Sequence, residues 1–529
     1  MNTYDVIVVG GGPGGSSVST MLAQAGRKVL LLERERFPRY HIGESLLSGS
    51  TELLKKLDVV EKMESAKYVK KFGVTWIWGA GRTPWTVYFK DALATPYDFG
   101  YQVDRASFDK MLLDNAREHA VTVMEESSVT SLCRDNGRVV GVEYSSPSGS
   151  KQRASSRWVV DASGQTNFIT KQVAQKLWDE KLKNMALWSY WKGAVRPEGI
   201  DSGNTFLPTF KDGWWWFIPL RDEITSVGVV LDKRNYAAAK ERGLDDYYLE
   251  AIDSTRELKE RLSPAKMVDD LRVTMDWSYS YDSFHGPGYA AVGDAACFID
   301  PLLSTGVHLA MLSGYLCAAA INTVLMGNSK DETSIMDFYQ EQYSREFRRM
   351  KEQIYFLYGG HRSPDSYFWH ARRAIDIPGA QPKAAFASLI AGAFEHRSWY
   401  RQFLTNLAVP ESLGKLGEAI FKGEAVGAVL LPYDVPLALN PQWQKTESYA
   451  VDGLEFRRAQ VLANGKGRTL PLTETLAAAL SNIDGCKTLQ EIVESLPEND
   501  DKQRASIKAA VNEAVTYGVL VTTREACIS

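Results

Sequence analysis

The chain begins with a short apolar run, residues 4–9, that leads directly into a glycine-rich stretch at residues 10–15. Residues 16–25 then carry apolar side chains at helical spacing, and a second apolar run at 28–32 ends at Glu33. A short, continuous apolar run is typical of a strand buried on both faces of a parallel sheet. The pattern therefore predicts strand, turn, helix and strand, the opening unit of a Rossmann-like α/β domain.

Later runs predict that an antiparallel sheet interrupts this α/β domain. Apolar strands are expected at 68–78 and 158–162, and long helices at 102–119 and 306–325. Between about 185 and 285, apolar and polar residues alternate as in a sheet with one buried face. Such an inserted sheet would form the wall of a substrate chamber.

The composition changes beyond about residue 432, which divides the chain into two predicted parts. Residues 1–432 are expected to form the core, with a helical part at about 330–432. Residues 433–529 are expected to form a small helix-rich, winged-helix-like module. Its acidic residues disfavour DNA binding, so covering the chamber or docking a partner is the expected role. The predicted helices are 472–480, 489–496 and 502–517, the strand is 518–521, and the acidic residues are Glu498, Asp500 and Asp501.

Composition and charge exclude several classes of protein. The 529 residues are 44% hydrophobic, with a net charge of −4 and a pI of about 6.1, and no basic tract suits a nucleic acid. The five cysteines are scattered without metal-ligand spacing, as is typical of a reducing cytoplasm. We expect no signal peptide and no bilayer-spanning run, hence a cytoplasmic protein without a membrane partner. The sequence indicates no oligomeric state.

The glycine-rich turn has the spacing of a dinucleotide-binding site. The first glycine allows the tight turn, the second lets the backbone approach a pyrophosphate, and the third lets helix and strand pack closely. The helix N-terminus presents N–H groups to the phosphates, and the acid that ends the second strand accepts hydrogen bonds from a ribose. The predicted cofactor contacts are Gly10, Gly12, Pro13, Gly14, Gly15 and Glu33.

Two further stretches indicate which nucleotide is bound. Arg105 precedes a helix with the spacing Arg-x-x-Phe-Asp-x-x-Leu, and Asp294 follows Gly293 after a strand. With the glycine turn, and in this order, they resemble the FAD-dependent monooxygenase superfamily of the hydroxybenzoate-hydroxylase type. The resemblance implies FAD as the cofactor, with Arg105 and Asp294 at its diphosphate and ribityl regions, and further contacts from Ser45 and Val307.

The stretch 213–219 contains Trp-x-Trp-x-Ile-Pro, formed by Trp214, Trp216, Ile218 and Pro219. Here the chain, from residue 1 to about 432, resembles the flavin-dependent halogenases, whose family motif has this form. The resemblance implies a structural or gating role for these residues. Bulky indoles between flavin and substrate would block direct oxygen transfer and let a small oxidant pass.

The resemblance also implies a catalytic lysine and a halide site. Lys71 falls where the family carries its essential lysine, although a shift of one residue in strand register would exchange it with Lys70. A desolvated Lys71 could hydrogen-bond hypohalous acid or form a haloamine. The halide would bind at the N-terminus of the 306–325 helix, a geometry that a Ser/Thr helix cap shares. Its predicted contacts are Ser304, Thr305 and Gly306.

One position departs from the tryptophan-specific members of the family. Those enzymes carry a glutamate just before the Ser-Thr-Gly triplet, and this chain has Leu303 there. The chain therefore resembles the other branch, which acts on phenolic or pyrrolic rings that are free or tethered to a carrier protein. Such rings are already electron-rich and need less assistance from a carboxylate.

The expected activity is halogenation of an aromatic ring in natural-product biosynthesis. Its cofactors would be FAD reduced by a separate flavin reductase, O₂ and a halide ion, with chloride expected from its abundance. Two alternatives stay open at this point: an FAD-dependent monooxygenase that hydroxylates or epoxidises its substrate directly, and a non-catalytic flavin-binding scaffold.

Overall fold

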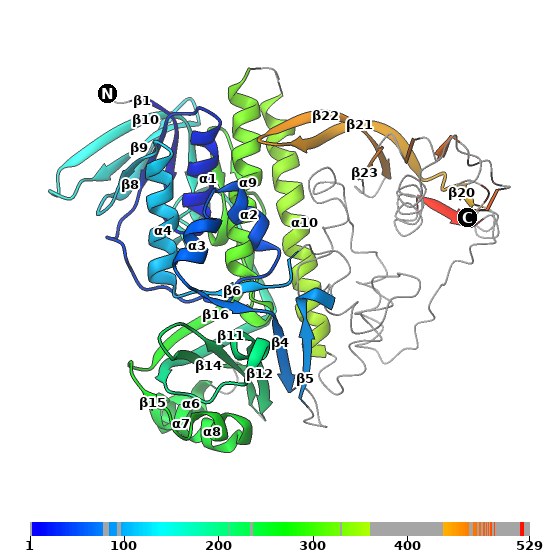
Figure 1. The fold of residues 1–529 in the computed structure, drawn as a ribbon. Helices are drawn as coiled ribbons and strands as arrows, with labels where there is room; N and C mark the ends of the chain where they lie inside the picture. The colour runs from blue at the N-terminus through cyan, green and yellow to red at the C-terminus, as the bar shows by residue number, and fades with distance from the viewer. Residues whose placement is uncertain are drawn as a thin grey trace.

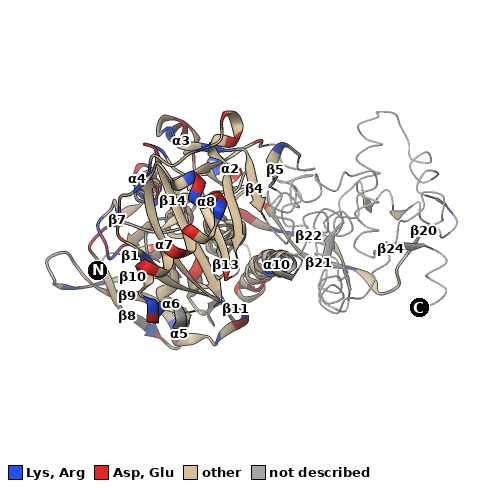
Figure 2. Cartoon of the chain, turned by 90° about the horizontal axis from the view of Figure 1, so that it is seen from below, with Lys and Arg blue, Asp and Glu red and all other residues tan. Residues whose placement is uncertain are grey.

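The computed structural model describes most of the core and part of the C-terminal region. The described ranges are 3–77, 84–91, 97–210, 212–232, 236–327, 331–359, 437–464, 469–472 and short stretches between 476 and 522. Two layers of sheet organise these residues, with helices between and outside them (Figure 1). Figure 2 shows acidic and basic residues interspersed over the described helices and strands.

The first sheet is the predicted Rossmann-like sheet. Its eight strands have the order β17-β18-β10-β1-β2-β7, with β9 on β10 and β8 on β9. Strand β1 pairs in parallel with β10 and β2, so its buried valines lie at the sheet centre. The strands are β1 (Thr3–Val9), β2 (Val29–Leu32), β7 (Thr122–Met124), β8 (Ser128–Asp135), β9 (Arg138–Ser145), β10 (Lys151–Asp161), β17 (His285–Gly286) and β18 (Tyr289–Ala291).

Three helices pack together beside this sheet: α1 (Pro13–Gln24), α4 (Arg105–Glu118) and α9 (Gly306–Leu325) (Figure 1). Helices α1 and α9 cross closely because glycines face each other there. A Cβ atom on Gly314 would lie 2.9 Å from the carbonyl oxygen of Gly14. Helix α9 is long and apolar enough to cross a membrane, although no bilayer-spanning run was expected from the sequence. Its most apolar segment is 89% buried inside the protein, as in the core helix of a globular domain.

The second sheet has nine strands in the order β19-β16-β11-β14-β13-β12-β4-β5, with β15 on β11. One face packs toward the nucleotide-binding half, and the other packs on α6 (Tyr236–Arg242), α7 (Leu244–Ser254) and α8 (Arg256–Leu262). The strands are β4 (Gly73–Ile77), β5 (Trp85–Tyr88), β11 (Lys176–Lys192), β12 (Thr205–Phe210), β13 (Gly213–Pro219), β14 (Ile224–Asp232), β15 (Lys266–Met267), β16 (Arg272–Tyr281) and β19 (Cys297–Phe298).

The single strand predicted at 68–78 is wrong, because the chain forms two strands there. Strand β3 (Val69–Lys71) pairs with β6 (Gly100–Gln102) in a separate small sheet, and β4 joins the nine-stranded sheet. Between them the carbonyl of Phe72 accepts a hydrogen bond from the N–H of Phe89 at 2.9 Å. The nine-stranded sheet thus includes strands well before residue 185, and Lys71 lies beside it rather than on it.

Further helices cover the core and carry the C-terminal hairpin. Helix α10 (Glu332–Gly359) packs on α9, and α2 (Ser50–Lys56), α3 (Val60–Ser65) and α5 (Thr170–Val173) are short. The hairpin of β21 (Trp443–Asp452) and β22 (Glu455–Asn464) docks its turn on α9. There the hydroxyl of Tyr315 donates to the carbonyl of Gly453 at 2.8 Å.

Only strands of the predicted C-terminal module can be compared with the structure. They are β20 (Leu437–Leu439), which pairs with β24 (Leu520–Thr522), and β23 (Thr469–Pro471), which pairs with β22. Nearly all of the three predicted helices, and the predicted helical part after residue 359, lie outside the described residues. The winged-helix assignment therefore stays a prediction.

Candidate active site

The glycine turn after β1 has a backbone that only glycine accommodates. Gly10 has a φ of +105°, and a Cβ atom on it would lie 2.4 Å from the carbonyl oxygen of Ala162. A Cβ atom on Gly15 would lie 1.9 Å from the carbonyl oxygen of Gly10. Helix α1 then starts at Pro13 without a side-chain cap at Gly12, so its first N–H groups are available to phosphate oxygens.

Glu33, at the end of β2, is buried against this turn. Its Oε2 accepts a hydrogen bond of 2.6 Å from the N–H of Gly11, and its Oε1 accepts one of 2.8 Å from the N–H of Glu35. The carboxylate therefore fixes both the turn and the loop that follows. Carboxylate oxygens have more than one acceptor position each, which leaves capacity for a ribose hydroxyl.

Arg105 lies at the start of α4 in a buried ion-pair cluster. Its Nε and Nη2 donate to the two oxygens of Asp109 at 2.7 and 2.9 Å, and its Nη1 donates to the carbonyl of Ile42 at 2.7 Å. Asp109 also binds Nη1 of Arg39 at 3.0 Å, and the Arg39 Nη2 lies 3.4 Å from where a Cβ on Gly12 would be. Arg39 thus borders the phosphate turn. Its place in the polar loop after Glu33 was the only sequence signal for it.

Asp294 lies in a 3₁₀ turn (Gly293–Ala295) after β18 and interacts electrostatically with Arg105. Burial raises the pKa of Asp294 to about 6, and the Arg105 guanidinium opposes that rise. The backbone is fixed by Asn167 Nδ2 and Tyr279 Oη, which donate to the carbonyl of Asp294 at 2.9 and 2.7 Å. Two predicted cofactor residues from distant parts of the chain therefore lie close enough for their charges to interact.

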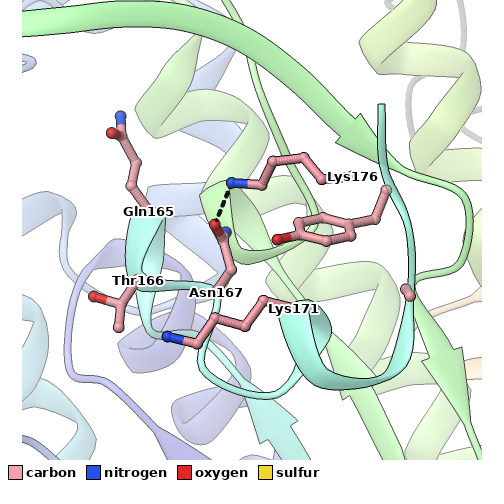
Figure 3. Close-up of a pocket in the computed structure, with 7 residues that line it drawn as sticks. Gln165, Thr166, Asn167, Lys171 and Lys176 are labelled. Atoms are coloured by element: carbon pink, nitrogen blue, oxygen red, sulfur yellow. Dashed lines mark hydrogen bonds between the residues drawn. The ribbon is translucent and has the colours of Figure 1, made fainter. Parts of the chain in front are cut away.

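A pocket opens beside this turn (Figure 3). Asn167 and Lys176 point toward each other in it, with Lys176 Nζ donating to Asn167 Oδ1 at 2.7 Å. The Lys176 ammonium also lies 3.9 Å from the ring centroid of Tyr279. None of the lining residues was singled out from the sequence: Gln165, Thr166, Asn167, Lys171, Ala174, Lys176 and Tyr281.

Lys71 is fully enclosed, with 1% of its surface exposed. Its Nζ donates to Ser45 Oγ at 2.8 Å and lies 5.4 Å from the ring centroid of Phe89. Burial lowers the pKa of Lys71 to about 7, so a neutral amine is accessible near neutrality. Lys70 points the other way, to an exposed ion pair with Glu64 at 3.2 Å. The structure thus buries Lys71 and exposes Lys70.

Ser45, which accepts the hydrogen bond from Lys71, belongs to a polar cluster between the two halves of the core. Its Oγ lies 3.2 Å from Oγ1 of Thr205 on β12, and Gln102 Nε2 donates to the same oxygen at 2.9 Å. Ser45 was predicted as a cofactor contact from the resemblance. Here its side chain holds the lysine, and Thr205 and Gln102 are residues that the sequence did not reveal.

The tryptophans of β13 alternate between two cores. Trp214 and Trp216 belong to the large core shared with the nucleotide-binding half, together with Ile218, whereas Trp215 faces the α6–α8 side. The rings of Trp214 and Trp216 lie 6.4 Å apart, and that of Trp188 lies 6.3 Å from Trp216. These indoles form one aromatic wall, and Pro219 ends the strand.

Hydrogen bonds fix the wall. Trp216 Nε1 donates to Ser226 Oγ at 3.1 Å, and Trp214 Nε1 donates to Tyr358 Oη at 2.8 Å. Tyr358 in turn donates to Oδ2 of the buried Asp300 at 2.9 Å, and Asn184 Nδ2 donates to the same oxygen at 2.7 Å. Burial raises the pKa of Asp300 to about 6.

Asp300 connects the wall to the predicted halide turn. Its Oδ1 accepts the N–H of Leu302 at 3.0 Å and so caps the 3₁₀ turn Pro301–Leu303. Ser304 follows with a φ of +59°, which redirects the chain into α9. The sequence placed Asp300 in this stretch but gave no sign that it holds Trp214 through Tyr358.

The turn before α9 has the features of a small anion site. Thr305 is buried, and its Oγ1 has no hydrogen-bond partner among the described residues. A Cβ atom on Gly306 would meet nothing within 4 Å, so the helix N-terminus faces open space. Val307 follows, and its Cγ2 lies 4.0 Å from where a Cβ on Gly43 would be. The predicted halide turn therefore adjoins the loop that carries Ser45.

Comparison with known proteins agrees with this arrangement. The tryptophan halogenase family model matches residues 5–96 and 89–421. The chain is 34% identical over 401 residues to a tryptophan 2-halogenase of Chondromyces crocatus, covering 74% of this chain and 76% of that protein. It is similar to the myxobacterial chondrochloren halogenase CndH (37% identity, TM-score 0.66, 81% and 98% of the two chains). It is also similar to the flavin-dependent halogenase CmlS, with 27% identity and a TM-score of 0.76 over 99% of this chain and 96% of that chain.

The fold and the site define an FAD-dependent oxidoreductase with a second sheet over the nucleotide-binding half. The chain belongs to the tryptophan halogenase family of flavin-dependent halogenases. It is therefore an enzyme that uses reduced FAD, O₂ and a halide ion, as the sequence predicted. Enzymes of this family generally receive reduced FAD from a separate reductase. The glycine cradle, Glu33 and the Arg105–Asp294 pair fit FAD.

Proposed function

We propose that the enzyme chlorinates an electron-rich phenolic or pyrrolic ring, free or tethered to a carrier protein, in cytoplasmic natural-product biosynthesis. The enclosed Lys71 carries the proposal. It lies at the junction of the Ser45 loop, which adjoins the halide turn, and strand β12 of the second sheet. Leu303, buried in the core, occupies the position where tryptophan-specific members have a glutamate, which supports a ring that needs no carboxylate assistance.

Bound reduced FAD with O₂ supplies the two-electron oxidation of halide to hypohalous acid. The residues of this chain do the rest. Thr305 and the first N–H groups of α9 bind the halide, since a helix N-terminus favours an anion. Trp214 and Trp216 exclude the organic substrate from the oxidation site. Lys71 donates a hydrogen bond to the hypohalous acid and so orients the oxidant toward the ring.

The lysine pair provides a matched test. We expect Lys71→Ala to lose halogenation by about 10² to 10⁴-fold, the range for a positioned proton-donating group, while oxidation of reduced FAD by O₂ continues. Lys70→Ala, one residue away and exposed, should keep full halogenation. Product is measured by mass spectrometry with chloride or bromide present. Retained halogenation in Lys71→Ala would remove the assigned role.

The acceptor is tested separately with a panel of phenols, pyrroles, the same rings on a carrier protein, and free tryptophan. The relative from Chondromyces crocatus is named for tryptophan, so tryptophan is the specific competing acceptor. Turnover of tryptophan at a rate above that of every phenol and pyrrole would overturn the proposed branch. A hydroxylated product without halogen would overturn halogenation itself.

A further inference from the structure

We propose that Glu44, Tyr190 and Tyr40 form the path by which protons enter the buried oxidation site from solvent. Tyr190 Oη lies 2.7 Å from Glu44 Oε1 and 3.0 Å from Tyr40 Oη. Glu44 is 3% exposed, whereas Tyr40 is 40% exposed. The hydrogen-bonded groups therefore run from the interior to the surface, and each can both accept and donate a proton when Glu44 is protonated.

The inner end of the path lies at the active site. Glu44 directly precedes Ser45, the hydrogen-bond partner of Lys71, and follows Gly43, which adjoins Arg105 and Val307. The second carboxyl oxygen, Oε2, is buried and has no hydrogen-bond partner of ordinary geometry among the described residues. The Ser226 hydroxyl interacts with the same carboxyl group, so Glu44 is held by two hydroxyls at the inner end of the path.

The surrounding residues hold the path in place. Trp188 Nε1 donates to Tyr40 Oη at 2.6 Å, and the Arg272 guanidinium stacks 3.8 Å from the Tyr40 ring centroid. Ser226 interacts with the Glu44 carboxyl and also accepts the hydrogen bond from Trp216. One tryptophan of the Trp-x-Trp-x-Ile-Pro motif is thus connected to Glu44 through a single hydroxyl.

The overall reaction shows why such a path is needed. Oxidation of halide balances as FADH₂ + O₂ + X⁻ + H⁺ giving FAD + HOX + H₂O. Substitution on the ring, ArH + HOX giving ArX + H₂O, releases no net proton because the ring hydrogen leaves in water. Each turnover therefore consumes one proton from solvent. This requirement rests on halide oxidation and holds for any acceptor ring.

The charges around Glu44 suit proton transfer near neutrality. Burial raises the pKa of Glu44 to about 7; Ser226, Tyr190 and the Arg105 charge lower it, and Asp104 raises it. The pKa values of Tyr40 and Tyr190 lie above the ordinary value, mainly from burial, with Arg272 opposing the rise at Tyr40. Both phenols therefore stay protonated while the carboxyl group exchanges its proton.

The first test follows Glu44 itself in the FAD-loaded oxidised enzyme without any acceptor. Infrared difference spectra between pH 5 and 9 should contain a protonated-carboxyl band with a midpoint near the Glu44 pKa of about 7. The component with this midpoint should vanish in Glu44→Gln, while the carboxyl bands of Asp294 and Asp300, whose pKa values are about 6, remain. The Glu44 component should titrate at higher pH in Tyr190→Phe, since the Tyr190 hydrogen bond lowers this pKa. An unchanged band in Glu44→Gln would overturn the assignment.

The control for Tyr190→Phe is Tyr248→Phe. Like Tyr190, Tyr248 has a hydroxyl that donates a hydrogen bond, to the carbonyl of Val227 at 2.9 Å, but it lies in the core on the opposite face of the same sheet. Both variants lose one hydrogen-bonded phenol hydroxyl, and only Tyr190→Phe interrupts the path. FAD affinity and melting temperature, measured for both, report any structural damage.

The second test measures halide oxidation in a single turnover with pre-reduced FAD, O₂, bromide and a diffusible trap for hypobromous acid. Tyr190→Phe should be slower by about 10²-fold, with a larger solvent deuterium isotope effect and a shifted pH profile, and imidazole should restore part of the rate. Tyr248→Phe should match the wild type. A wild-type isotope effect and pH profile in Tyr190→Phe would overturn the path. Because the trap replaces the natural acceptor, this outcome is independent of whether the enzyme prefers phenols.

Discussion

The two ends of the active site handle buried charge in opposite ways. At the cofactor end, Arg105 and Arg39 share the buried carboxylate of Asp109, so each of these three charges has an opposite partner within 3.0 Å. At the oxidant end, Lys71 is equally buried, and its hydrogen-bond partner is the neutral hydroxyl of Ser45. Paired charges stabilise a binding surface, whereas a buried ammonium held by a neutral group opposes folding and gains reactivity.

The largest expected effect comes from breaking the paired end. Asp109→Ala would leave two guanidinium groups without their buried carboxylate, and such a change costs about 3–5 kcal/mol of unfolding free energy. FAD affinity should fall with it, because Arg39 would no longer be held beside the glycine turn. Urea unfolding and FAD titration measure the two losses. Asp114→Ala is the control, since its ion pairs with Lys110 and Arg117 are exposed. Equal losses in both variants would contradict the distinction.

The second prediction has the opposite sign. The pKa of Lys71 falls from 10.5 unfolded to about 7 folded, so between these values the unfolded chain binds more protons and stability rises with pH. Lys71→Met removes this pH-dependent contribution to the free energy of unfolding. The variant should be more stable than the wild type at pH 7, and the difference should shrink by up to about 1.4 kcal/mol per pH unit toward pH 10.

Urea unfolding of both proteins between pH 6 and 10 measures this difference, with Lys70→Met as the exposed control. For the control, the difference in unfolding free energy from the wild type should not change with pH, because the Lys70 ammonium is partly exposed and ion-paired with Glu64. A flat difference for Lys71→Met as well would mean that Lys71 is hydrated in solution. The buried Lys71 ammonium would then not destabilise the folded protein.

The same division explains what the sequence could predict. Part of the cofactor end lies in one contiguous stretch, in which strand, glycines, helix and Glu33 follow each other. Spacing there predicted the fold and a dinucleotide, and the resemblance carried by Arg105 and Asp294 identified the dinucleotide as FAD. The missed member of this end, Arg39, lies in an irregular loop where no periodicity indicates direction. At the oxidant end the predicted residues come from β3, β13 and the turn before α9, and only the family resemblance joined them in advance.

What the sequence could not supply were the contacts that hold these residues. The break at Phe72 moved Lys71 out of the sheet on which it was predicted, because β3 pairs with β6 while β4 pairs with β5 and β12, and both partners of this choice lie outside the local pattern. Asp300, Tyr358 and Glu44 are ordinary residues in the sequence. Their importance arises from burial and from partners far away in the chain, which no local pattern records.

The smallest expected effect tests the oxidant end where it is open. Gly306→Ala places a methyl group where nothing lies within 4 Å, so the free energy of unfolding should change by no more than about 0.5 kcal/mol. If the halide occupies that space, its affinity should fall by about tenfold, equivalent to about 1.4 kcal/mol, and iodide should lose more than chloride because it is larger. Halide titration of the FAD-loaded oxidised enzyme, followed by flavin absorbance, measures this without turnover. An unchanged affinity for all halides would place the anion elsewhere, and the Thr305 hydroxyl, which has no partner in the described part of the chain, would then need another explanation.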